Sequence, residues 1–130
     1  MNRRLLQLHA GAAWLFLASI AVQVFLAGAA ISQLGGSGTF ASHSDFGYTW
    51  VGLAALAVVV TAIVARAGRR SILITVALMA LNIMQTILPA ARGSIPAVAA
   101  LHPVNALLLF ALSIWYGRRA WHTAAMAPGA

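Results

Sequence analysis

Two histidines, each followed by a small residue, are the best candidates for cofactor ligands in this chain. Gly47 follows His43 by four residues, and Ala106 follows His102 by four. Residues i and i+4 share one face of a helix, so each pair presents an imidazole beside a surface with almost no side chain. A flat macrocycle held between two helices through its metal ion requires this combination. The pattern predicts a bis-histidine haem site with His43 and His102 as iron ligands and with Gly47 and Ala106 beside the ring.

The composition is that of a membrane protein. Hydrophobic residues make up 62% of the 130 residues and charged residues only 7%, whereas charged residues make up about a quarter of a soluble domain. A chain this small cannot bury so much apolar surface internally, so much of it must face the lipid bilayer. The absence of cysteine excludes disulfides, thiolate zinc sites, iron–sulfur clusters and covalently attached haem.

Four apolar stretches reach the roughly 20 residues that a helix needs to cross a membrane. They run over about 5–31, 46–65, 71–88 and 96–116. The connections are short, which favours an all-α, up-down-up-down bundle of four transmembrane helices. We expect residues 1–130 to form one such domain.

The arginines predict the orientation of this bundle. The net charge is +7, and seven of the eight arginines fall on one side of the predicted spans: Arg3, Arg4, Arg66, Arg69, Arg70, Arg118 and Arg119. Their position at the ends of apolar runs indicates topology signals and anionic-lipid contacts, and no nucleic-acid partner is expected. The positive-inside rule predicts a multi-pass protein of a bacterial cytoplasmic (inner) membrane with both termini in the cytoplasm.

A glutamine near the outer end of the preceding span accompanies each histidine. Gln23 is followed by an outer loop and then His43, and Gln85 is followed by an outer loop and then His102. The chain therefore reads as two helix pairs related by a pseudo-twofold axis along the membrane normal. Such an axis would place the two histidines opposite each other at equal depth, as two axial ligands of one iron require.

This repeated order of glutamine, outer loop and histidine resembles one four-helix half of a haem A synthase. The segment 23–38, followed by a histidine on the next helix, is similar to that half, and so is the segment 85–102. The chain is also similar, over residues 13–119, to a family of short bacterial four-helix membrane proteins of unknown function with His-x-x-x-Gly-Tyr and His-Pro-Val-Asn signatures. In haem A synthases the corresponding histidines bind haem at the outer end of each half, and the resemblance assigns that role to His43 and His102.

The resemblance has two departures. Haem A synthases carry a glutamate, implicated in their chemistry, three residues before the second-helix histidine, and Phe40 occupies that position here. The chain also corresponds to one four-helix half where the synthase has two. The resemblance therefore implies haem binding without the oxidation of a haem methyl group.

Two charged residues, Arg92 and Asp45, have two interpretations each. Arg92, the one arginine on the outer side, is either a plain loop charge or the partner of a haem propionate. Asp45, the only acidic residue, either orients a histidine or caps the second helix.

His9 and His122 are candidates for a second site. The aromatic residues near the span ends, Trp14, Tyr48, Trp50, Trp115, Tyr116 and Trp121, are expected to be interface anchors.

The sequence thus predicts a small b-type haem protein without catalytic activity, active in electron transfer or haem handling. The chain has neither paired carboxylates nor a phosphate-binding loop. The alternative is an accessory structural subunit of a larger photosynthetic or respiratory membrane complex, or a homo-oligomer. Its histidines would then bind a chlorophyll-type pigment, one histidine per ring, or no cofactor at all.

Overall fold

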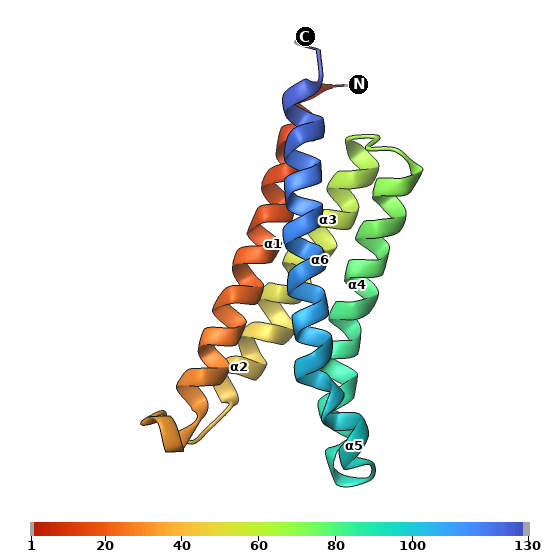
Figure 1. Ribbon diagram of the computed structural model, residues 1–130. Helices are drawn as coiled ribbons and strands as arrows, with labels where there is room; N and C mark the ends of the chain where they lie inside the picture. The colour runs from red at the N-terminus through yellow and green to blue at the C-terminus, as the bar shows by residue number, and fades with distance from the viewer. Residues whose placement is uncertain (1, 129–130) are drawn as a thin grey trace.

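The computed structural model describes residues 2–128 as an all-α bundle of four long helical segments (Figure 1). The first segment is α1 (Arg3–Ala30), and the third is α4 (Arg69–Ala90). The second consists of α2 (Ala41–Phe46), the π-helical η2 (Gly47–Val51) and α3 (Gly52–Val64). The fourth consists of α5 (Pro96–Ala99) and α6 (Leu101–Met126), and the short 3-10 helices η1 (Ser32–Leu34) and η3 (Ala91–Gly93) lie in the connecting loops.

Each of the four segments is long and apolar enough to cross a membrane. They span Arg3–Ala30, Ala41–Val64, Arg69–Gly93 and Pro96–Met126, with a mean hydropathy of 1.9 or 2.0 in their most apolar windows. The predicted all-α four-helix fold is confirmed, and these dimensions indicate a multi-pass membrane protein. The helices extend beyond the predicted spans, most of all at Met126, because backbone hydrogen bonding continues past the last apolar residue of a span.

Each of the four segments packs against two others, so that the bundle is square in cross-section. α1 packs against α3 and α6, and α4 packs against the same two helices. The segment α2–η2–α3 therefore lies diagonally opposite α6. In Figure 1 both termini and the α3–α4 turn lie at one end of the bundle, which we call the terminal end. The opposite end, with η1, α2, η3 and α5, we call the histidine end.

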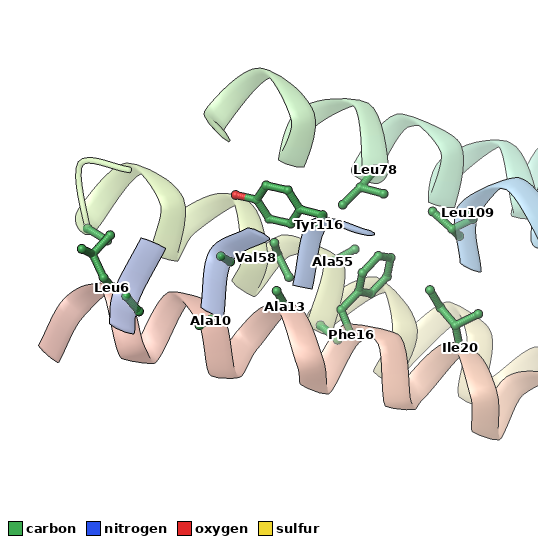
Figure 2. Close-up of a cluster of buried hydrophobic side chains, with 14 of the residues drawn as sticks. Leu6, Ala10, Ala13, Phe16, Ile20, Ala55, Val58, Leu78, Leu109 and Tyr116 are labelled. Atoms are coloured by element: carbon green, nitrogen blue, oxygen red, sulfur yellow. The ribbon is translucent and has the colours of Figure 1, made fainter. Parts of the chain in front are cut away.

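The hydrophobic core is concentrated away from the histidine end. Figure 2 shows its centre, where Phe16 and Ile20 of α1, Leu78 of α4 and Leu109 of α6 are buried together. Alanines on α1 and α3 let the backbones approach closely, as membrane helices require when no water drives their association. Within 24–50 and 84–108, by contrast, Ala30 and Leu88 alone are buried. The two histidines thus lie where apolar packing is sparse.

The helices are irregular near both histidines. Directly after His43, the segment widens into the π-helical turn Gly47–Val51, and such turns are frequent at functional sites. Pro89 lies inside the last turn of α4 and cannot donate a hydrogen bond to the carbonyl four residues before it. The fourth segment is interrupted at Ala100, where Pro103 likewise removes the helical hydrogen bond to Ala99.

Candidate functional site

His43 and His102 lie next to each other across the bundle. Their ring centroids are 6.3 Å apart, and the ring planes meet at 75°. His43 lies in α2 and His102 in the first turn of α6, on diagonally opposite segments. Both side chains are half-buried. The Phe40 ring lies perpendicular to the His43 imidazole, at 88°, with centroids 5.9 Å apart.

Gln23 of α1 orients the His43 ring. The Nδ1–H of His43 donates to the backbone carbonyl of Gln23 at 3.0 Å. The side-chain amide of Gln23 in turn donates to the backbone carbonyl of His43 at 2.8 Å and lies 3.2 Å from Nε2 of the ring. With the proton on Nδ1, Nε2 carries the lone pair, which is the tautomer that binds a metal through Nε2.

Gln85 of α4 has the corresponding relation to His102. The backbone carbonyl of Gln85 accepts from Nδ1–H of His102 at 3.1 Å. Pro89, four residues further along, has no N–H to donate, so this carbonyl is free for the histidine. With its amide oriented to satisfy its neighbours, Gln85 Nε2 lies 3.2 Å from the His102 carbonyl and 2.7 Å from Nδ1. A donation from this amide to Nδ1 and a donation from Nδ1–H to the Gln85 carbonyl require different tautomers of His102.

The small residue after each histidine makes room for the glutamine. A Cβ atom added at Gly47 would stand 2.5 Å from Nε2 of Gln23, closer than real contacts allow. In the other half, Oε1 of Gln85 accepts from the backbone N–H of Ala106 at 2.5 Å. The surface predicted to adjoin a macrocycle is therefore occupied by a glutamine amide in both halves. Contact of Gly47 and Ala106 with a ring stays a prediction.

The two glutamines differ in one hydrogen bond. Oε1 of Gln85 lies 3.0 Å from Nδ2 of Asn105, which also donates to the Leu81 carbonyl at 2.9 Å. Asn105 lies three residues after His102, and Phe46 lies three residues after His43. Phe46 has no donor, and Oε1 of Gln23 is buried without a hydrogen-bond partner among the described residues. The site thus contains one unsatisfied acceptor, which is unfavourable unless a ligand or water supplies a donor.

Neither Arg92 nor Asp45 forms a hydrogen bond with either imidazole within residues 2–128. Arg92 is exposed in η3, at the same end of the bundle as the histidines. Asp45 lies inside α2, and the N-cap of that helix is Phe40 without a side-chain hydrogen bond. The prediction that Asp45 caps this helix was therefore wrong, because the helix begins earlier, at Ala41. The Gln23 carbonyl holds the position that Asp45 would need in order to orient His43.

Sequence reasoning missed a second polar cluster, in the core near the terminal end. His9 of α1 and Tyr116 of α6 are 2% and 1% exposed. Thr61 Oγ1 donates to the Ala57 carbonyl at 2.7 Å and accepts from Nδ1–H of His9 at 3.0 Å. Nε2 of His9 then accepts from the hydroxyl of Tyr116 at 2.7 Å. The bonds form a directed chain in which each of these buried side chains has a partner.

The burial of Tyr116 contradicts its expected place at the membrane interface. Tyr116 falls three residues after the buried Ser113 and four before the buried Ala120, so the helical period places all three on the same buried face of α6. His9 shares the face of α1 that carries Ala13, Phe16 and Ile20, which are buried as well. His122 is exposed at the terminal end, far along α6 from His102.

The donor set at the histidine end is two imidazoles. Among residues 2–128 no three histidines or acidic side chains lie close enough together to hold a metal ion. A metal between His43 and His102 would therefore need further ligands from a bound group, and a porphyrin supplies four nitrogens in one plane. Two imidazoles alone do not complete a metal site.

Comparison with known proteins identified no relative of this chain. The chain matches no family model, no curated protein and no solved structure.

Proposed function

We propose that this protein is a small membrane haem protein in which His43 and His102 are the two axial ligands of one b-type haem. The observation that carries this proposal is the 6.3 Å between their ring centroids. Two imidazoles on one metal ion place their centroids about 6 Å apart, because each metal–nitrogen bond is about 2 Å long and each nitrogen lies about 1 Å from its ring centroid. The centroid spacing therefore supports one iron shared by the two rings.

The same spacing favours one shared metal over two separate pigments. A chlorophyll-type arrangement with one histidine per ring would insert two macrocycles between the imidazoles. A separation of 6.3 Å between ring centroids is suited to a single ring. Haem b is therefore the preferred cofactor, and a pigment-binding accessory subunit is less favoured.

The protein's own residues would orient and shield the cofactor. In the haem-bound protein the carbonyls of Gln23 and Gln85 would accept from the two Nδ1–H groups and leave each Nε2 as the ligating atom. Ligation of His43 would replace the contact between its Nε2 and the Gln23 amide. With both axial positions taken by imidazoles, the haem would supply one-electron redox chemistry, which favours electron transfer or haem handling over oxygen chemistry.

Three further observations support a ligand at this end. The histidine end has few buried apolar residues of its own, Gln23 Oε1 lacks a donor, and the exposed Arg92 is available for a propionate. The sequence resemblance to one half of haem A synthase points to the same cofactor and the same two histidines.

We also propose a bacterial cytoplasmic membrane as the location, with both termini in the cytoplasm. Seven arginines at the terminal end against Arg92 at the other support this orientation. The haem would then lie near the outer face. A reporter active only in the cytoplasm, fused after Pro128, should be active, and the same reporter inserted after Ser94 should be silent. The reverse pattern would contradict the orientation.

The absorption spectrum of the purified protein tests the haem proposal. The protein expressed with haem supplied should show the sharp reduced bands of a low-spin b-type haem. His43→Ala and His102→Ala should each abolish these bands, because one imidazole is lost from the iron. His122→Ala is the matched control, since His122 is exposed at the terminal end, and its spectrum should equal that of the native protein.

Two results would overturn the proposal. One is a correctly folded native protein that takes up no haem. The other is a low-spin spectrum that survives His102→Ala. Addition of free imidazole to the His102→Gly variant distinguishes a lost ligand from a lost fold, because only the former is restored.

A further inference from the structure

One face of α6 changes from apolar to basic as it approaches the terminal end. The residues on it are spaced by three and four and therefore lie in a row along the helix. They border a shallow and largely open depression of about 550 Å³ on the surface of α6: Ala111, Ile114, Trp115, Arg118, Arg119 and His122. We call this the basic hollow. Its apolar part lies toward the middle of the bundle and its basic part toward the end.

The arginines of the basic hollow have no acidic side chain to pair with. The chain contains a single acidic residue, Asp45, and it lies in α2 at the histidine end (Figure 1). The other five arginines of the terminal end add to the same positive field. Arg118 and Arg119 are exposed, so an anion from outside the protein can reach both. A guanidinium pair without counter-ion is suited to phosphate oxygens.

The sequence of apolar, aromatic and basic residues along the hollow matches the sequence of acyl chain, boundary region and headgroup along a phospholipid in a bilayer. Ala111 and Ile114 lie within the apolar stretch 96–116, which the sequence predicts to cross the membrane. Trp115 is 46% exposed and belongs to the residue type that concentrates at the boundary between acyl chains and headgroups. Arg118, Arg119 and His122 follow one to two turns further on, at headgroup depth.

We propose that the basic hollow is a binding site for an anionic phospholipid. Its phosphate lies against Arg118 and Arg119, and one acyl chain runs along Trp115, Ile114 and Ala111. The site lies at the opposite end of the bundle from His43 and His102 and does not depend on the haem proposal. Charge complementarity selects the anionic headgroup, and the adjoining apolar stripe selects a lipid over a free phosphate.

Lipid binding by paired variants tests this site. The protein is placed in bilayer discs of phosphatidylcholine, alone or with phosphatidylglycerol, and its thermal unfolding and retained lipids are measured. Phosphatidylglycerol should raise the unfolding temperature of the native protein. In Arg118→Gln/Arg119→Gln this rise should disappear, and the apparent affinity for the anionic lipid should fall by at least about tenfold.

Arg69→Gln/Arg70→Gln is the matched control. It removes the same charge from another exposed arginine pair of the terminal end, at the start of α4 and outside the hollow. The control should keep the response to phosphatidylglycerol. An equal loss in both double variants would overturn the proposal, because it would show a diffuse effect of net charge. Equal protection by inorganic phosphate in phosphatidylcholine discs would also overturn it, because the ligand would then be a free anion.

A second measurement does not depend on stability. Phosphatidylglycerol with brominated acyl chains should quench tryptophan fluorescence more strongly than brominated phosphatidylcholine at the same mole fraction. Trp115→Phe should remove this difference, whereas Trp50→Phe, at the histidine end, should retain it. Equal quenching of the native protein by both lipids would contradict a specific site.

Discussion

The imidazole rings of His43 and His102 lie 6.3 Å apart between their centroids, although they come from opposite halves of the chain. Each ring is oriented by the backbone carbonyl of a glutamine on the preceding helix. A carbonyl that accepts from Nδ1–H leaves the lone pair of the imidazole on Nε2.

Pro89→Ala should weaken haem binding without destabilising the fold. An alanine N–H restores the helical hydrogen bond to the Gln85 carbonyl and so competes with His102 for that acceptor. We expect haem affinity to fall by roughly tenfold, within the range typical of groups that hold a ligating histidine. The unfolding temperature of the haem-free protein should stay equal or rise.

Pro96→Ala serves as the control for this variant. Pro96 is at the first position of α5, where its missing N–H has no helical partner in any case. Its haem affinity, measured by titration of the haem-free protein, should equal that of the native protein. An unchanged affinity in Pro89→Ala as well would show that the Gln85 carbonyl does not orient the ligand.

Gly47→Ala should destabilise the protein by about 1 kcal/mol, because the Gln23 amide must move and lose its hydrogen bond to the His43 carbonyl. The added Cβ would meet the Gln23 amide at 2.5 Å. Gly52→Ala is the control, because a Cβ there has no neighbour within 4 Å, and it should be neutral or slightly stabilising. Denaturant titration in detergent measures both.

The contact between Gly47 and Gln23 can be isolated with a double-mutant cycle. In a Gln23→Ala background the added methyl group has space, so Gly47→Ala should cost much less than in the native protein. Equal costs in both backgrounds would mean that the π-helical backbone, and not the glutamine, requires glycine at this position.

Tyr116→Phe should lower the free energy of unfolding by about 1–3 kcal/mol, because it leaves Nε2 of the buried His9 without a donor. Tyr48→Phe, at an exposed tyrosine, should have little effect. The haem spectrum should not change in either variant, since the His9 cluster lies toward the terminal end. A spectral change in Tyr116→Phe would link the two polar clusters.

Asn105→Leu should also destabilise the protein, by about 1 kcal/mol, the usual contribution of a side-chain hydrogen bond. It removes the donor to the Leu81 carbonyl and to Oε1 of Gln85. Because Gln85 also packs beside His102, haem affinity should fall together with stability. A change in stability alone would show that the Gln85 side chain has no part in binding.

Much of this organisation could be predicted from the sequence. The number of helices follows from apolar length, and the pairing of each histidine with a glutamine follows from the repeat of Gln23 and Gln85. The same pattern did not reveal how each pair meets, because the contact uses the glutamine carbonyl as well as its side chain. Pro89, four residues after Gln85, was the local sign of a free carbonyl.

The sequence by itself determined a membrane-spanning four-helix bundle, because hydropathy and charge act along the chain and need no knowledge of its neighbours. The repeat of glutamine, loop and histidine also predicted that His43 and His102 lie opposite each other. The tertiary structure alone decided that Gln23 fills the space beside Gly47 and that Tyr116 is buried against His9. Those relations depend on how helices rotate and cross. Rotation and crossing follow from the side-chain packing of all four segments together, which no single stretch of sequence contains.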